Sequence, residues 1–240
     1  MITQCSILLN MLALYLARHG QDEDNAGGIL NGRRDQPLTE LGRDQARTVA
    51  GKIKASNLSF DAIYSSPLQR AAETANIIAT LGVQQEIDNN DVQKLDDLAE
   101  RDFGAMTGKN TADILTLCGP DDILKTETVN YFLSPEGAET FPQLMERARR
   151  LLAFLRENHE SSVSSKESAT EKNEGDDSIL LVTHGDFGKM FYAAYYNLDW
   201  KDVLRDFHFG NSEVILCSHK ISMPPTPDQT HIFSIEQFNS

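Results

Sequence analysis

The sequence predicts an α/β fold, a three-layer α/β/α sandwich with helices on both faces of a mostly parallel central sheet. Along the first half of the chain, short hydrophobic runs of strand length alternate with longer segments of helical periodicity. This alternation is typical of parallel strands joined by crossover helices. The run from Leu12 to Ala17 is hydrophobic at every position, as expected for a strand buried on both faces at the centre of such a sheet.

The elements of the first half follow from local patterns and helix-start signals. Thr39 is a suitable N-cap with Glu40 in the first turn, and Pro67 stands where the first turn of a helix tolerates proline. The predicted elements are strands at 12–17, 61–65 and near 84–88, and helices at 39–55 and 67–80.

The second half is less regular. From Gly104 to about Pro135 we expect a loop and helix region. An amphipathic helix follows near 138–158, and its apolar positions at helical spacing indicate core packing. Residues 160–177 contain one Val and one Ala among polar and charged residues, which predicts a flexible insertion. The remaining predictions are a strand at 178–183, a helix at 187–196, a strand at 213–217 and an edge hairpin in the tail to Ser240.

Length and composition predict one domain over residues 1–240. The chain has 240 residues and is 40% hydrophobic, enough for one substantial core. Residues 1–10 are expected to be a dispensable extension, because Met11 directly precedes the first strand. The hydrophobic stretch from Ile7 to Ala17 is too short to span a bilayer and lacks a basic leading region, so it predicts a core strand and not a signal.

Net charge and cysteine content limit the kinds of partner and the cellular compartment that we expect. The net charge of -14 argues against nucleic acid or an anionic membrane as the main partner, because both reward clustered Lys and Arg. The cysteines, Cys5, Cys118 and Cys217, have scattered spacings without a CxxC pair. We therefore expect a reducing, cytoplasmic location.

Polar motifs follow several of the predicted strands. Arg18-His19-Gly20 comes directly after the first strand, and open α/β sheets bind ligands where such strands end. Further motifs follow in order: the loop RHGQDEDNAGGILNGRRDQPLTELG, then SSPLQRA with Thr74-Ala75, then Glu100 with Phe103-Gly104, and finally Val182-Thr183-His184-Gly185.

Together these motifs resemble the histidine phosphatase (phosphoglycerate mutase-like) superfamily, from about Leu12 to about Asn211. The resemblance implies the fold of that family and an enzyme that needs neither a metal nor an organic cofactor. The other histidines support this expectation, because His208, His219 and His231 show no HxxxH or HExxH spacing.

A phosphate ester requires a neutral nucleophile, cationic donors for the nonbridging oxygens and a proton for the leaving oxygen. By the resemblance, His19 attacks phosphorus and forms a phosphohistidine that water then hydrolyses. We expect its other ring nitrogen to donate to a backbone carbonyl, which fixes the tautomer. Arg18 and Arg70 match the two phosphate-binding arginines of the family, and their planar guanidinium groups suit a dianion. His184 matches the second histidine, which donates to a phosphoryl oxygen.

Further substrate-binding residues are predicted in the loop after the nucleophile. Asn25 is expected to bind phosphate by the resemblance. Asn31 and Gly32 can supply a side-chain amide and a backbone N–H to phosphate oxygens, but they are equally consistent with ordinary turn formers. Gly185, directly after His184, is also predicted to bind substrate.

Glu100 aligns with the acid of the family, which must be protonated to give a proton to the leaving alkoxide. A substrate phosphate nearby should raise its pKa. Asp96, Asp97 and Asp102 lie in the same segment and are alternative or simply solvated carboxylates.

The sequence also departs from the family pattern. Asp22 stands where the family usually has Thr or Ser, so it brings an extra negative charge near the phosphate site and leaves the affinity for phosphate open. Thr107 replaces a common Glu before Gly108.

A larger departure lies between Gly108 and Pro135. Phosphoglycerate mutases resemble one another in a paired-arginine segment that grips the substrate carboxylate, whereas the cations of this chain there are Lys109 and Lys125. Without that grip, the phosphoenzyme is expected to lose its phosphoryl group to water.

The sequence thus predicts a phosphatase that hydrolyses small phosphomonoesters, with a small phosphorylated metabolite as its partner. The alternatives are a cofactor-dependent phosphoglycerate mutase and a sugar phosphatase of the fructose-2,6-bisphosphatase branch. A noncatalytic phospho-ligand-binding module is a third alternative, but it predicts damage to the catalytic constellation, and each core residue is present.

Overall fold

The computed structural model describes residues 12–83, 92–159, 177–217 and 231–233. Three sequence predictions therefore lie outside the described residues: the extension at 1–10, the strand near 84–88 and the insertion at 160–177, apart from Asp177.

The central sheet has the strand order β3-β2-β6-β1-β7-β8. Strands β1, β2, β3 and β6 are parallel to one another, and β7 pairs with β1 in the antiparallel direction, as does β8 with β7. The mostly parallel sheet is confirmed, and β8 occupies the edge that was predicted for the tail. The strands are β1 Leu12–Arg18, β2 Ala62–Ser65, β3 Val92–Lys94, β6 Asp177–Thr183, β7 Val214–Cys217 and β8 His231–Phe233.

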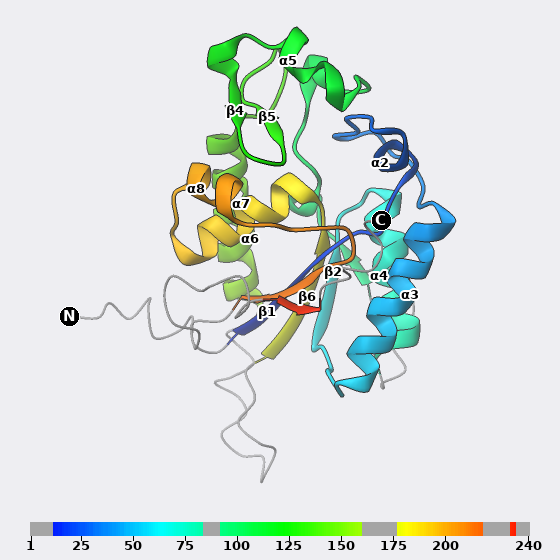
Figure 1. The fold of residues 1–240 in the computed structure, drawn as a ribbon. Coiled ribbons are helices and arrows are strands. Elements are labelled where there is room, and N and C mark those ends of the chain that lie inside the picture. Colours follow the sequence, from blue (N-terminus) through cyan, green and yellow to red (C-terminus); the bar gives the residue numbers. More distant parts are fainter. Residues whose placement is uncertain (1–11, 84–91, 160–176, 218–230, 234–240) are drawn as a thin grey trace, which may run out of the picture.

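Helices cover both faces of this sheet (Figure 1). Strand β1 shows why both faces are hydrophobic: Leu14 and Leu16 pack into the core on one side, and Tyr15 and Ala17 into the core on the other. One layer contains α3 Glu40–Ala55 and α4 Gln69–Gly82, and the other contains α6 Phe141–His159, α7 Gly185–Tyr196 and α8 Trp200–Asp206.

Helix α3 starts where the N-cap residue Thr39 predicts. Thr39 accepts a hydrogen bond from the Gly42 N–H at 3.0 Å and caps α3. Helix α4 begins at Gln69, two residues later than predicted, because Leu68 is extended. Among the described residues, no helix combines the length and hydrophobicity that a membrane span needs.

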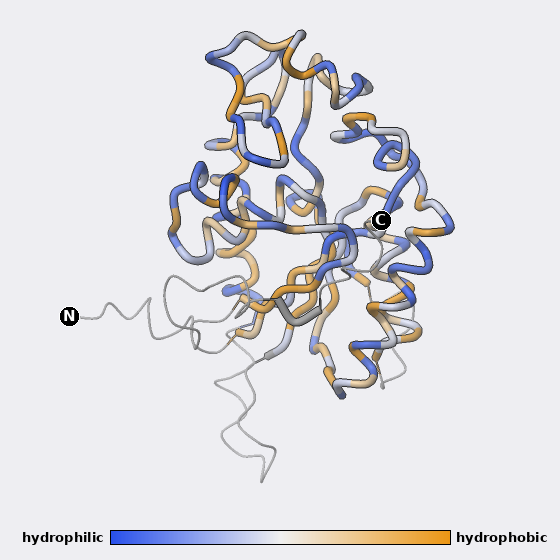
Figure 2. Tube along the Cα trace, in the orientation of Figure 1, coloured by the Kyte–Doolittle hydropathy of each residue, from blue (hydrophilic) through white to orange (hydrophobic). Residues whose placement is uncertain are grey.

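Residues 104–135, here called the cap, form a separate group of short elements at the top of Figure 1. The cap contains a two-stranded antiparallel sheet, where the sequence predicted only loops and helices. Figure 2 shows its backbone alternating between hydrophilic and hydrophobic residues, in contrast to the hydrophobic strands below. Its elements are the 3₁₀ helices η4 Gly104–Met106, η5 Thr111–Asp113 and η6 Pro120–Asp122, helix α5 Ile114–Leu117, and strands β4 Ile123–Lys125 and β5 Asn130–Phe132.

The cap packs against the loop that follows β1. That loop contains α2 Glu23–Gly27, and Ile29 pairs with Asn110 in an isolated bridge. A small apolar cluster holds the two segments together, with Leu30 on the loop side and Met106, Ile114 and Phe132 on the cap side. On the chain between β3 and the cap lies one more 3₁₀ helix, η3 Asp96–Leu98.

Candidate active site

Three neighbouring parallel strands end side by side, and each is followed by a polar residue. His19 follows β1, His184 follows β6 and Ser66 follows β2. The ladder continues one step past the strands, because the His19 N–H donates to the Thr183 carbonyl at 3.0 Å. The rings of His19 and His184 consequently lie with their centres 4.9 Å apart.

His19 is buried and neutral. Its Nδ1 donates to the Gly20 carbonyl at 2.6 Å, as expected from the sequence, so Nε2 carries the lone pair. Burial, and after it the charges of Arg70 and Arg18, hold the pKa of His19 well below its ordinary value. An imidazole in this state is a competent nucleophile at neutral pH.

The loop that carries His19 is fixed by backbone packing. A Cβ atom on Gly20 would lie 2.3 Å from the Gly42 carbonyl oxygen, and one on Gly42 would lie 2.1 Å from the Gln21 carbonyl oxygen. The Gly20 N–H also donates to Thr74 Oγ1 at 3.2 Å, and this hydroxyl donates to the Arg70 carbonyl. The loop is thereby joined to the starts of both α3 and α4.

Arg70, in the first turn of α4, is fully buried, and protein groups surround its guanidinium group. Nη1 donates to the Arg34 carbonyl at 2.6 Å and Nη2 to the Gly32 carbonyl at 2.8 Å. Nε lies 3.2 Å from His184 Nδ1 and 3.2 Å from Asp22 Oδ2. Gly32 therefore meets the site through its carbonyl, which positions Arg70.

Arg18 has a free donor. Its Nη1 donates to the Phe209 carbonyl at 2.8 Å, but its buried Nε has no hydrogen-bond partner among the described residues. Gly185 lies against this guanidinium group, since a Cβ atom there would be 3.4 Å from Arg18 Cζ. A buried donor without a partner is costly, so this position suits an anionic oxygen.

Both ring nitrogens of His184 are engaged. Nδ1 accepts from Arg70 Nε, so Nε2 carries the hydrogen and donates to Ser66 Oγ at 2.8 Å. Burial and the charge of Arg70 hold the pKa of His184 well below its ordinary value. A phosphoryl oxygen that accepts from His184 must replace Ser66. The role of Ser66 was missed in the sequence, although its place after β2 in the SSPL motif was a usable signal.

Asp22 lies inside the site. It is fully buried and caps α2, with Oδ1 accepting from the Asn25 N–H at 2.7 Å. Oδ2 accepts from Asn31 Nδ2 at 2.6 Å and faces Arg70 Nε. Burial raises the pKa of Asp22, and the Asn25 hydrogen bond and Arg70 oppose that rise. One carboxylate thus engages three groups that the sequence assigned to phosphate.

Asn25 is tied to the nucleophile through a residue to which the sequence gave no role. Asn211 Nδ2 donates to Asn25 Oδ1 at 3.2 Å and to the His19 carbonyl at 3.1 Å. The side chain of Asn25 therefore lies beside the nucleophile loop, whereas that of Asn31 is directed to Asp22.

Glu100 lies at the start of α7. Its Oε1 accepts from the N–H groups of Arg101 and Phe187 at 2.8 and 3.1 Å, and its Oε2 accepts from the Asp186 N–H at 3.3 Å. Burial, followed by the negative charge of Asp186, raises the pKa of Glu100. A raised pKa increases the protonated fraction that proton donation requires.

The other acids of that segment are directed elsewhere. Asp97 Oδ1 accepts from Arg150 at 3.3 Å on the surface, and Asp102 Oδ1 accepts from the Gly104 N–H at 2.9 Å. The segment itself is held by Arg147, which donates to the Ala99 and Glu100 carbonyls.

A lysine and a tyrosine that the sequence did not single out form a contact between α7 and the cap. Lys189 Nζ, from α7, donates to the Tyr131 hydroxyl of β5 at 2.6 Å. A lysine within the hydrophobic sequence of α7 was the available signal.

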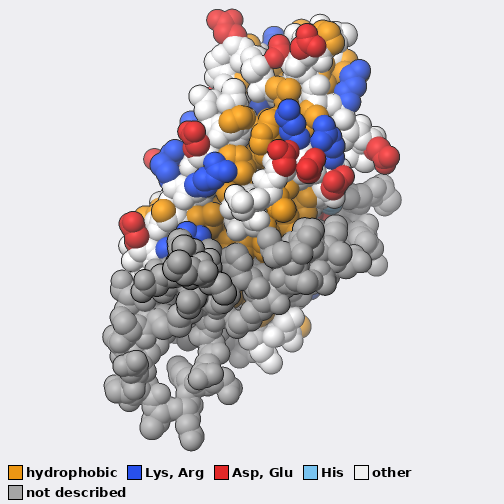
Figure 3. All heavy atoms as spheres, turned by 90° about the vertical axis from the view of Figure 1, so that its left-hand side faces the viewer, with side chains coloured by type: hydrophobic (Ala, Val, Ile, Leu, Met, Phe, Trp, Pro, Cys, Tyr) orange, Lys and Arg blue, Asp and Glu red, His pale blue; other side chains and the backbone are white. Residues whose placement is uncertain are grey.

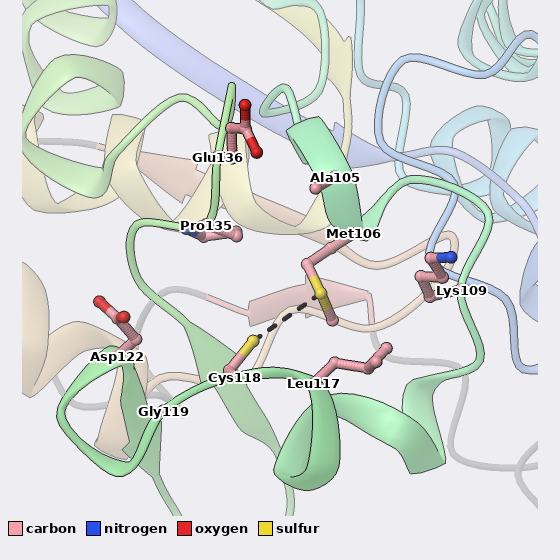
Figure 4. Close-up of a pocket in the computed structure, with 9 residues that line it drawn as sticks. All are labelled: Ala105, Met106, Lys109, Leu117, Cys118, Gly119, Asp122, Pro135 and Glu136. Atoms are coloured by element: carbon pink, nitrogen blue, oxygen red, sulfur yellow. Dashed lines mark hydrogen bonds between the residues drawn. The ribbon is translucent and has the colours of Figure 1, made fainter.

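The cap also contains a hollow of about 410 Å³ (Figure 4). Met106, Leu117, Cys118 and Pro135 form its apolar lining, and Lys109 lies at its edge. None of the predicted site residues lines it, so this hollow is distinct from the site at the strand ends. Within the described residues, no group of three or more His, Cys, Asp and Glu side chains is arranged to hold a metal ion.

A family model, histidine phosphatase superfamily (branch 1), matches residues 14–221 of the chain. A relative from Parvibaculum lavamentivorans named 2,3-bisphosphoglycerate-dependent phosphoglycerate mutase is 35% identical over 136 residues, which are 56% of this chain and 62% of the relative. The chain therefore matches less than two thirds of that relative's length.

Two solved structures are also similar. A mycobacterial glucosyl-3-phosphoglycerate phosphatase in complex with VO3 is 26% identical with a TM-score of 0.65, covering 85% of this chain and 91% of that one. A phosphoserine phosphatase from Entamoeba histolytica in complex with 3-phosphoglyceric acid is 28% identical with a TM-score of 0.64, covering 86% and 90%.

Proposed function

Because the chain belongs to the histidine phosphatase superfamily, we propose that it hydrolyses small phosphomonoesters through a phosphohistidine at His19. The observation that carries this proposal is the state of His19. Its imidazole is buried and neutral, its Nδ1 is fixed by the Gly20 carbonyl, and it lies beside His184 at the ends of parallel strands. This state suits a nucleophile better than a structural role, which does not require a free Nε2.

In the first step, His19 Nε2 attacks phosphorus and the bond from phosphorus to the leaving oxygen breaks. Glu100 gives its proton to that oxygen, so an alcohol departs. Arg18, Arg70 and His184 offset the charge on the nonbridging oxygens during the transfer, with Asn25 as a further phosphate ligand. The unpartnered Nε of Arg18 supports its part in this scheme.

In the second step, water attacks the phosphoryl group on His19, and Glu100 takes a proton from that water. The bond between phosphorus and Nε2 breaks, which releases inorganic phosphate and restores the neutral imidazole. The scheme uses neither a metal nor an organic cofactor.

A mutase is the second candidate, because a relative carries that name. Two observations favour hydrolysis. The similar solved structures are named phosphatases. In the cap, Lys109 lies at the edge of the separate hollow, and Lys125 is exposed on β4. Neither lysine replaces the paired arginines with which phosphoglycerate mutases hold a phosphoglycerate for return transfer.

The deciding experiment follows the fate of the phosphoryl group. The protein is incubated with 3-phosphoglycerate, with and without 2,3-bisphosphoglycerate, and the products are followed by phosphorus NMR. We expect inorganic phosphate as the main product in both cases. Rapid interconversion of 2- and 3-phosphoglycerate with little phosphate release would establish the mutase instead.

A further inference from the structure

Lys189 is a buried ammonium group without an ion-pair partner in the part of the chain that the structure describes. Its side chain is 8% exposed, and its hydrogen bond goes to the Tyr131 hydroxyl, whose ring centre lies 5.1 Å from Nζ. Among the described residues, no carboxylate oxygen lies within 4.0 Å of Nζ, the limit for an ion pair. A buried charge without a counter-ion is costly to fold, which points to an anion that binds there.

The position of Lys189 connects it to the proposed site. It follows Gly185 by four residues, so the two share one face of α7. Gly185 lies against the guanidinium group of Arg18. The charges of Arg18, a proposed phosphate ligand, and of Glu100, the proposed acid, both influence the pKa of Lys189.

Nearby acids are engaged with other groups. Asp186 pairs with Arg101 at 2.8 Å, and Glu213 Oε2 accepts from the Gly210 N–H. Their negative charges act on Lys189 without reaching ion-pair distance and disfavour a second dianion at this place.

The donors at this place suit a carboxylate. Nζ offers N–H donors, and Tyr131, which accepts from Nζ, keeps its own O–H to donate. An ammonium and a phenol can each bind one oxygen of a carboxylate, which carries one negative charge. The phosphate dianion is assigned to the arginines Arg18 and Arg70.

We infer that Lys189 and Tyr131 form a carboxylate-binding subsite for the leaving alcohol, so that the preferred substrates are phosphate esters of hydroxy acids. This inference rests on the proposed hydrolysis, in which the alcohol departs next to Glu100. The cap and α7 supply one residue each, so the subsite forms only where these two elements meet (Figure 1).

The test compares substrates that differ only in the carboxylate. 3-Phosphoglycerate is compared with glycerol 1-phosphate, and O-phosphoserine with phosphoethanolamine, with released phosphate as the readout. We expect kcat/KM to be roughly tenfold to a hundredfold higher for the acid of each pair, the range for a hydrogen bond between charged groups.

Variants then test whether Lys189 and Tyr131 cause the preference for the acid of each pair. In Lys189→Met, the acid-to-neutral ratio of kcat/KM should fall close to one, and Lys189→Arg should retain most of it. Tyr131→Phe removes only the hydroxyl and should reduce the ratio several-fold. Lys125→Met, which removes an exposed lysine of the cap, is the control and should keep the wild-type ratio. Because each ratio is internal to one preparation, a loss of folded protein does not change it.

The outcomes separate this inference from the function on which it rests. A wild-type ratio near one in both pairs would overturn the carboxylate subsite while leaving the phosphatase intact. An unchanged ratio in both Lys189→Met and Tyr131→Phe would do the same. Release of phosphate from none of the four compounds would overturn the proposed function itself.

Discussion

Two regions meet at the site, and they are built differently. The strand-end region consists of Arg18, His19, Ser66, Arg70 and His184. A continuous backbone ladder sets its strand residues in place, and Arg70 comes from the first turn of α4. The cap is a set of elements of three or four residues around a small apolar cluster. The difference teaches that chemistry and substrate choice are separable here. Under the proposed function, the sheet fixes the reacting groups, and the cap supplies Tyr131 to the proposed subsite for the leaving alcohol.

The surfaces of the two regions differ in the same way. The central strands are almost completely buried, whereas the cap exposes Leu115, Leu117 and Val129 at 50%, 52% and 43%. Figure 3 shows apolar side chains reaching the surface among charges of both signs. The cap therefore leaves more hydrophobic surface exposed than the central strands do. Under the proposed function, changes in it are expected to alter selectivity more than chemistry.

The largest effect is expected from the nucleophile of the strand-end region. In His19→Ala, kcat should fall by about ten-thousandfold or more, because no phosphoenzyme can form. Rapid acid quenching with labelled substrate should trap an acid-labile, base-stable phosphoenzyme in the wild type and none in the variant. His159→Ala, at the far end of α6, is the matched control. Undiminished label in His19→Ala would remove His19 from the mechanism.

Glu100→Gln should have the next largest effect, and one that depends on the leaving group. We expect a loss of about a hundredfold or more with an alkyl phosphate and a much smaller loss with p-nitrophenyl phosphate, because a good leaving group needs no proton. Since burial raises the pKa of Glu100, the alkyl substrate should lose kcat/KM as the pH rises through that pKa, and the variant should lack this fall. Equal losses on both substrates would assign Glu100 a positioning role and remove it as the acid of the mechanism.

A moderate effect is expected from the negative charge that faces Arg70 of the strand-end region. In Asp22→Asn, the affinity for orthovanadate should rise about tenfold, because the variant removes the negative charge beside Arg70. The amide oxygen can still accept from the Asn25 N–H and cap α2. Competitive inhibition of p-nitrophenyl phosphate hydrolysis measures the change.

Asp24→Asn is the control for long-range charge. It also removes one negative charge, but Asp24 pairs with Arg34 at 2.9 Å and not with Arg70. An equal gain in both variants would mean that net charge, not the contacts of Asp22, limits anion affinity.

The smallest effect is a pH dependence of the subsite between α7 and the cap. Burial lowers the pKa of Lys189 to about 8, while Asp186, Glu213 and Glu100 raise it and Arg18 lowers it further. The ammonium form exists below that pKa, so the preference for the acid of each substrate pair should decline as the pH rises through about 8.

The ratio of the two kcat/KM values isolates this effect, because groups that act on both substrates cancel. The pKa of Tyr131 is raised by burial, so its hydroxyl stays protonated over this range. In Lys189→Arg the guanidinium group stays charged, and the ratio should not change with pH. A decline that persists in that variant would assign the titration to another group.

Much of the strand-end region could be predicted from the sequence, because hydrophobic runs mark strands and the polar residue after each run marks the ligand-binding edge. The register of β1 and β6, which brings His19 beside His184, is consistent with that reading. The pairing of Asp22 with Arg70 could not be predicted, since no local pattern specifies which charges meet after folding.

The cap was harder to predict for a physical reason. Strands β4 and β5 have three residues each, too few to show an alternating pattern. The contact between Lys189 and Tyr131 joins residues 58 positions apart on two different elements. Side chains that meet in this way depend on tertiary packing, which a single sequence does not express.

Two glycines next to the nucleophile, Gly20 and Gly42, allow close backbone packing there. Gly20 and Gly42 bring the backbone of the nucleophile loop into direct contact with the start of α3, and no side chain there can rotate aside. The backbone of the nucleophile loop is therefore held against the start of α3. Under the proposed function, we expect any opening that admits a substrate to come from the cap and not from the nucleophile loop.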